Sequence, residues 1–115
     1  MPKLLLCLST LIVFAYPAWA DSYKLVNNSG SPLKVQSKAL RVNPSQIRPA
    51  FFDLAAGETK DVIFGTEFRL WFVHIYNKDN MAQNHYWDRK PQPTDPDQHW
   101  TIVVKPGVEV SITKQ

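Results

Sequence analysis

Apolar and polar residues alternate along most of the chain after residue 20, and this period of two predicts β-strands rather than helices. The segment 22–27 (SYKLVN) alternates in this way, and so does the segment 32–37 (PLKVQS). Between them lies a cluster of turn-forming residues that includes Gly30. We therefore expect these two strands to form a hairpin.

The pattern is less regular from residue 38 to residue 49 (KALRVNPSQIRP). Pro44 and Pro49 interrupt this segment, and each proline restricts the backbone of the residue before it. We expect a short edge strand over 40–42, followed by a loop. Strands are predicted again over 51–54 and 59–64, joined by a turn around a glycine.

The segment 67–77 (EFRLWFVHIYN) has apolar residues at both odd and even positions. A strand with two apolar faces is typical of the middle of a sheet that is covered on both sides. We therefore predict that this segment is the central strand of the fold. One predicted face carries Phe68, Leu70, Phe72, His74 and Tyr76, and the other carries Arg69, Trp71, Val73, Ile75 and Asn77.

The C-terminal part reads as a hairpin of the segments 99–104 and 108–114, both with apolar residues at alternate positions. We expect Val104 to lie opposite Val108, with a three-residue loop from Lys105 to Gly107. The alternative is a two-residue Pro-Gly turn of type II. We favour the longer loop because the alternative register places the apolar residues of one strand beside polar residues of the other.

About seven short strands with turns at short intervals indicate an all-β protein. The predicted fold is a single small antiparallel β-sandwich, and an immunoglobulin-like arrangement is one possibility. A small closed β-barrel is the alternative.

The first 20 residues differ from the rest. They contain Lys3, an apolar run from residue 4 to about residue 16, and the sequence Ala18-Trp19-Ala20. A basic start, a short apolar core and a small-x-small end are typical of a secretory signal peptide. We therefore predict a signal peptide over 1–20, cleavage after Ala20, and one domain over 21–115. The domain would be periplasmic or secreted, without a membrane anchor after cleavage.

Cleavage changes the composition. The only cysteine, Cys7, lies inside the apolar run, so the mature domain has no disulfide, no thiol nucleophile and no lipid-attachment cysteine at the cleavage point. Loss of Lys3 leaves 12 basic and 10 acidic residues, a net charge of 12 − 10 = +2 with neutral histidines. This weak and scattered charge does not favour nucleic acid as a partner.

The polar segment 77–98 separates the two most apolar parts of the chain, and we interpret it as a long loop. It holds Tyr86, Trp87 and Arg89, residue types that are enriched in binding hot spots, with His85 beside them. We predict that the protein is a non-enzymatic binding module that recognises a protein or a glycan through this loop. The alternatives are that the aromatic side chains cap the core, or that the segment is disordered or forms a short helical turn. Prolines at positions 91, 93 and 96 stiffen the second half of the loop.

A small metal-binding protein is the alternative function. His85 and Asp88 are three residues apart, and His74 and His99 flank the same segment. Histidine and carboxylate suit zinc or copper, although no established metal-ligand spacing is present. No nucleophile motif such as G-x-S-x-G occurs, so we do not expect an enzyme, and we expect no cofactor.

Overall fold

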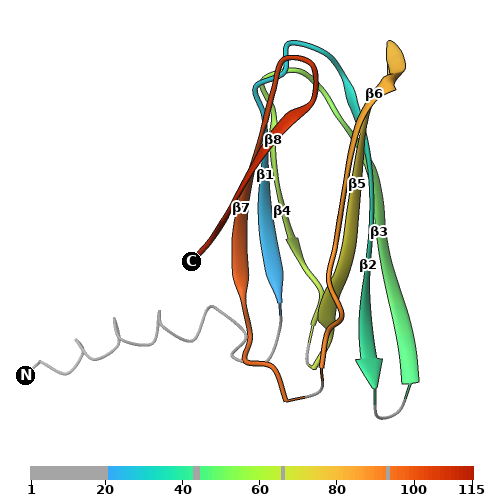
Figure 1. Ribbon diagram of the computed structural model, residues 1–115, viewed down its shortest axis with the longest axis vertical. Helices are drawn as coiled ribbons and strands as arrows, with labels where there is room; N and C mark the ends of the chain where they lie inside the picture. The colour runs from blue at the N-terminus through green and yellow to red at the C-terminus, as the bar shows by residue number, and fades with distance from the viewer. Residues whose placement is uncertain (1–20, 43–44, 66, 93) are drawn as a thin grey trace, which may run out of the picture.

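The computed structural model describes residues 21–42, 45–65, 67–92 and 94–115, so the predicted signal peptide lies outside the described residues. Eight strands follow one another along the chain (Figure 1). They are β1 (Ser22–Asn27), β2 (Leu33–Val42), β3 (Ser45–Leu54), β4 (Thr59–Ile63), β5 (Arg69–Asn77), β6 (Asn80–Asp88), β7 (His99–Lys105) and β8 (Glu109–Lys114).

The strands form two sheets of four, which face each other as the layers of a sandwich (Figure 1). One sheet has the order β4-β1-β7-β8 and the other has the order β3-β2-β5-β6. Every pairing is antiparallel except that of β1 with β7, which is parallel. The predicted all-β sandwich is confirmed, with eight strands rather than about seven. The barrel alternative is wrong, because the two sheets do not close on each other. Among the described residues, no helix is long and apolar enough to cross a membrane.

The predicted hairpin of the first two strands is wrong, because β1 and β2 belong to different sheets. Asn27, at the end of β1, is fully buried, and its side chain fixes the connection. Its Nδ2 donates to the carbonyl groups of Leu54 and Ala55 at 3.1 and 3.0 Å, and its Oδ1 accepts from Ser29 N at 3.0 Å. These bonds tie the turn to the neighbouring β3–β4 connection, so the chain crosses between the sheets instead of folding back.

The predicted loop after residue 42 is also wrong, because β2 and β3 form a hairpin in which each strand has ten residues. Pro49 lies within β3, where it pairs with Lys38. β3 is an edge strand, and an edge tolerates proline because one side of it needs no ladder hydrogen bonds.

β5 is confirmed as an interior strand, since it pairs with β2 on one side and with β6 on the other. The predicted faces are wrong near its start. Lys38 pairs with Phe72 while Ala39 pairs with Leu70, so Trp71 is an extra residue on β5. An extra residue of this kind, a β-bulge, changes which of the following side chains point to the interior and which point outward. Leu70 therefore shares the buried face with Val73, and Phe72 points outward.

The β7–β8 hairpin is confirmed, but its predicted register is wrong by two residues. Val104 lies opposite Val110, and the loop consists of residues 106–108. Gly107 has a φ of 81° and Val108 donates its N–H to Lys105 O at 3.0 Å, which is a type II turn with proline in its favoured position. Val108 then takes a φ of 58° and acts as one extra residue, so the apolar residues still share a face.

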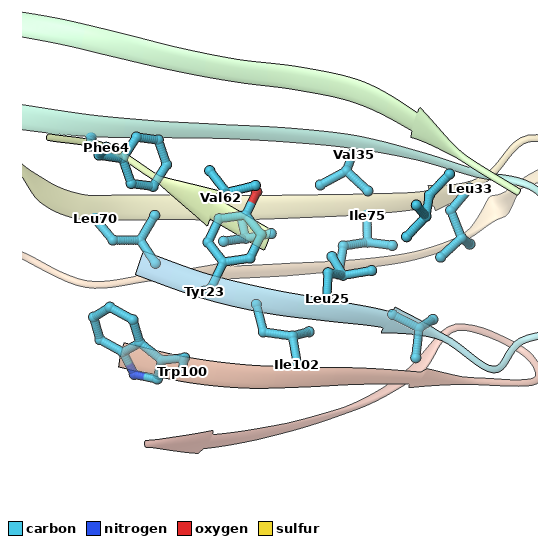
Figure 2. Close-up of a cluster of buried hydrophobic side chains, with 14 of the residues drawn as sticks. Tyr23, Leu25, Leu33, Val35, Val62, Phe64, Leu70, Ile75, Trp100 and Ile102 are labelled. Carbon is cyan, nitrogen blue, oxygen red and sulfur yellow. The ribbon is translucent and has the colours of Figure 1, made fainter. Parts of the chain in front are cut away.

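The core lies between the sheets and contains residues from both of them, including Leu25 and Ile102 from one sheet and Val35 and Ile75 from the other (Figure 2). The core also contains Tyr23, which is 2% exposed and brings a polar hydroxyl group into the interior. The Tyr23 hydroxyl donates to Ser37 Oγ at 2.8 Å, and Ser37 Oγ donates to Ala50 O at 3.1 Å. Burial raises the pKa of Tyr23, so its hydroxyl stays protonated and remains a donor.

Candidate functional site

The segment predicted as a loop is mostly a strand. Residues 80–88 form β6, which pairs with β5 and is the free edge of its sheet. The segment 89–98 connects β6 to β7 in the other sheet, and its described residues form no strand. The predicted loop over 77–98 is therefore wrong, and so is the alternative of a helical turn.

The alternation of β6 separates the residues that the sequence had grouped as one site. Trp87 lies opposite Val73, and His85 lies opposite Ile75, so both side chains face the interior of the sandwich. Tyr86 lies opposite His74 and faces outward. The four predicted binding residues thus do not form one surface.

Trp87 caps the core. Its ring lies 5.6 Å from the ring of Trp100, centroid to centroid, in an edge-to-face arrangement. It is half-buried and packs against the core cluster. For Trp87, the structure matches the alternative in which the aromatic side chain covers the end of the core.

Arg89 holds the connection between the sheets together. Its Nε donates to Leu70 O at 2.8 Å, one terminal nitrogen donates to Gln98 Oε1 at 3.1 Å, and the other lies 3.2 Å from Asp21 Oδ2. The same guanidinium lies 5.2 Å from the Trp100 ring centroid. These contacts give Arg89 a structural role, and its role in ligand binding stays a prediction.

Asp21 is the ion-pair partner of Arg89, and it is fully buried, at 0% exposure. Besides Arg89, it accepts hydrogen bonds from Leu70 N at 2.7 Å and from Gln98 N at 3.0 Å. Burial raises the pKa of the Asp21 carboxyl, and the two backbone hydrogen bonds and the Arg89 charge oppose that rise. No local sequence pattern indicates the pair of Asp21 and Arg89, because the two residues are far apart in the chain.

Aromatic side chains gather on the opposite side of the same sheet. The rings of Phe72 and Tyr86 stack at 5.7 Å, those of His74 and Tyr86 meet edge to face at 5.3 Å, and those of His74 and Tyr76 lie 4.1 Å apart. We call these four residues, Phe72, His74, Tyr76 and Tyr86, the outer aromatic cluster. Three of them were assigned by sequence to a covered face of β5, so only Tyr86 was recognised as a partner-binding candidate, and His74 was considered only as a metal ligand.

Hydrogen bonds order the cluster. His74 Nε2 donates to Asn84 Oδ1 at 3.2 Å, and His74 Nδ1 accepts from the Tyr76 hydroxyl at 3.0 Å. The signal that could have revealed the cluster is the even-numbered aromatic series of β5, read together with its hairpin partner β6.

The same face extends to the far edge of the sheet. Phe51 of β3 pairs with Gln36, which pairs with His74, which pairs with Tyr86, so these residues form one row across four strands. The two ends of the row are the most exposed, at 56% for Phe51 and 51% for Tyr86. This face presents apolar side chains to solvent, with no further layer of the described chain above it.

A separate groove of about 420 Å³ lies between β6 and β8 and is open to solvent. Three half-buried apolar side chains, Trp87, Val110 and Ile112, form part of its wall. Its full lining consists of Trp87, Arg89, Gln98, Trp100, Val110, Ile112 and Lys114. The described lining contains two cations and no carboxylate.

The residues suggested for a metal do not assemble. His85 faces inward whereas Asp88, opposite Phe72, faces outward. His74 uses both ring nitrogens within the outer aromatic cluster, and His99 Nδ1 hydrogen bonds with Ser22 Oγ. Within the described ranges, no group of three or more histidine, cysteine or acidic residues is placed to hold a metal ion.

Comparison with known proteins identifies similar folds only. No family model matches the sequence, and no curated protein matches it. A crystal structure of the type VI secretion system lipoprotein TssJ1 from Pseudomonas aeruginosa is similar with a TM-score of 0.55 and 12% identity, over 86% of this chain and 98% of that one. An NMR structure of a protein from Eubacterium rectale has a TM-score of 0.45 and 9% identity, over 82% and 86% of the two chains. At 12% identity, the similarity to TssJ1 concerns the fold alone.

Proposed function

We propose that this chain is an exported, non-enzymatic binding module that recognises a partner protein through the outer face of the sheet β3-β2-β5-β6. The observation that carries the proposal is the row from Phe51 to Tyr86, whose two end rings are each more than half exposed. Apolar side chains that are exposed on the same face of a small domain indicate an interaction surface.

The outer aromatic cluster has the properties of a binding hot spot. Tyr86 is held by ring contacts with Phe72 and His74, so little side-chain freedom remains to be lost on binding. Tyrosine also combines a large apolar area with a polar tip, which explains its enrichment at the centres of interfaces.

A protein partner fits this face better than a glycan. A sugar ligand needs free hydrogen-bonding groups beside an open aromatic ring. Here both nitrogens of His74 are already engaged, by Tyr76 and by Asn84, and the Tyr86 ring is stacked on Phe72. The rings of the outer aromatic cluster therefore offer mainly apolar contact area, and Gln36 is the polar side chain of the row beside them.

Three further observations support an exported, non-enzymatic role. The first 20 residues have the pattern of a signal peptide. The similar structure from Pseudomonas aeruginosa is that of a lipoprotein, which supports a location in the cell envelope. The described lining of the groove between β6 and β8 has no carboxylate, histidine or hydroxyl group, and Lys114 is its one side chain of a type that can act as a base or nucleophile.

The test is a cross-linking capture from an envelope extract, with the domain 21–115 as bait. The double variant Phe51→Ala/Tyr86→Ala removes both ends of the row. The matched control is Ile63→Ala, which removes an apolar side chain that is 55% exposed on β4, in the other sheet. We expect a partner that the wild-type and Ile63→Ala domains retain and that the double variant loses.

A glycan array probed with the same three proteins provides the second arm. Glycan binding that depends on Phe51 and Tyr86 would show that the ligand of this face is a sugar and not a protein. Capture that is equal for all three baits, together with no glycan binding, would contradict a binding role for this face.

A further inference from the structure

β6 is unlike the other edge strands of the sandwich. Free edges are usually protected by proline, by charged residues or by shortness. β3 contains Arg48 and Pro49, β4 has only five residues, and β8 has six residues with a charge at each end. β6 has nine residues, contains no proline, glycine or lysine, and has a single charged residue, Asp88, at its end. It is therefore the one long and unprotected edge among the described strands.

The backbone of β6 offers hydrogen-bonding groups at this edge. Arg89 donates its N–H to Trp71 O at 3.0 Å, so the N–H of residue 89 points towards β5. In an antiparallel pair this direction alternates from residue to residue. The N–H and C=O groups of Asn84, Tyr86 and Asp88 consequently point away from β5, to the open side.

The groove between β6 and β8 lies beside this edge. The interior-facing side chain of Trp87 belongs to β6, and Val110 and Ile112 face it from β8. All three are only half-buried although they pack against the core. A strand added beside β6 would place every second side chain over this wall and cover it.

We propose that β6 accepts an extended segment of the partner protein as a fifth strand of its sheet. The segment has apolar residues at alternate positions, which enter the groove, and an acidic residue at the end that meets Lys114. This inference rests on the proposed function insofar as the partner is a protein, and it assigns the contact to the edge of the sheet rather than to its outer face alone.

The charge of the groove lining is the reason for expecting an acidic residue on the added strand. The groove lining contains Arg89 and Lys114 and no carboxylate among its described residues. Arg89 already has Asp21 and Asp95 as ion-pair partners. Lys114 is exposed and lies in line with Val110 and Ile112 on the same face of β8, so it is the cation that a carboxylate on the added strand would approach.

The experiment begins with selection of binders from a displayed library of random peptides of about ten residues, the upper end of ordinary strand length. The selected peptide is then the probe. We expect alternating apolar residues, an acidic end, and slower hydrogen exchange at the amides of Asn84 and Tyr86 in the complex. N-methylation of the peptide at its ladder positions should abolish binding, because it removes the donors that a strand needs.

Two variants test the charge. Lys114→Glu should weaken binding of the selected peptide about fivefold, in the range of one exposed ion pair and its reversal. Lys24→Glu, on an exposed position of β1 in the same sheet, should leave binding unchanged.

Other outcomes overturn the inference. Failure of the library to give a saturable binder contradicts an accessible edge, and an exchange footprint on β3, β4 or β8 contradicts the assignment to β6. Binding that depends on the Phe51 and Tyr86 side chains but ignores N-methylation leaves the outer-face function intact and excludes strand addition. Concentration-dependent self-association that protects the same β6 amides assigns the edge to a second copy of this chain instead.

Discussion

The two long sides of the sandwich are closed in different ways. On the side of β3 and β4, the Arg48 guanidinium lies 4.2 Å from the Phe68 ring centroid and donates to Phe64 O at 2.5 Å. Lys60 lies 5.5 Å from the Phe52 ring centroid on the same side. Long cationic side chains therefore cover the aromatic residues at this edge of the core.

On the side of β6 and β8, the core is covered only in part. Arg89 and the Trp87–Trp100 pair pack near Asp21, and together with Val110 and Ile112 they line a groove that stays open to solvent. At one edge of this domain, cationic side chains therefore cover the aromatic residues of the core, whereas the other edge combines a structural clamp with an accessible apolar wall. The following variants test how these two edges differ.

Arg89→Ala should have the largest effect on stability. The variant leaves the carboxyl group of Asp21, which is 0% exposed, without its cation. Removing one partner of a buried ion pair costs about 3 kcal/mol. Urea denaturation measures the loss, and Lys90→Ala, an exposed cation next in the chain, should change the free energy of unfolding by less than about 0.5 kcal/mol. Equal effects of the two variants would show that Arg89 does not act as a clamp.

Trp87→Ala should destabilise the domain by about 2 kcal/mol, below the cost for a fully buried aromatic residue because Trp87 is half-buried. Its ring contact with Trp100 is lost at the same time. Tyr86→Ala, one residue earlier and outward-facing, should cost less than about 0.5 kcal/mol. Thermal melting of both variants measures this difference in stability. A melting temperature for Trp87→Ala that equals the wild-type value would contradict the capping role.

Gly65→Ala tests the closed side. Gly65 has a φ of 101°, and a Cβ at this position would lie 2.6 Å from the Arg48 guanidinium. Backbone strain and this contact together should cost about 1–2 kcal/mol. Gly30 has a φ of 81° with no atom near the added Cβ, so Gly30→Ala measures the strain alone and should cost less.

The double variant Gly65→Ala/Arg48→Ala provides the further control. The contact part of the Gly65→Ala cost should disappear in the Arg48→Ala background, which a double-mutant cycle detects. Additive effects would show that Arg48 does not pack against this turn.

We expect the smallest effect from pH, through the contribution of the Asp21 carboxyl to the free energy of unfolding. The pKa of Asp21 is raised in the folded state, so the folded protein binds the proton more tightly than the unfolded chain does. The stability that this group contributes is therefore greatest at pH values below its unfolded pKa, and it falls as the pH rises through the window up to the raised pKa. The wild-type domain should lose stability relative to Asp21→Asn as the pH rises through this window, as measured by denaturation at several pH values. The opposite slope would mean that the Arg89 charge outweighs burial.

Much of the fold could be predicted because alternation is a local property. The strands over 22–27 and 99–104 and the interior position of the 67–77 segment followed from the side-chain pattern alone. The register of the last hairpin did not follow, because the left-handed φ of Val108 adds one residue to the turn. The hairpin of residues 33–54 was missed because Pro49 is acceptable at an edge, and the sequence does not show which strands are edges.

The candidate site of the sequence prediction groups residues that the fold separates. Tyr86 is exposed as expected, but Trp87 and Arg89 serve the core and the clamp. A polar segment rich in proline and aromatic residues resembles a loop, and only pairing with β5 shows that its first half is a strand. Once it is a strand, neighbouring residues must point to opposite faces, so His85 and Tyr86 could not share a surface.

The sequence by itself determined the class of the fold, because a period of two in hydrophobicity is compatible with strands and with little else. It also determined the absence of cysteine chemistry over residues 21–115, since Cys7 is the only cysteine. Only the tertiary structure decided which strands are edges, which side chains meet Asp21 and which face of β6 carries Tyr86. These features depend on contacts between residues far apart in the chain, such as Asp21 with Arg89, and no local pattern encodes such a contact.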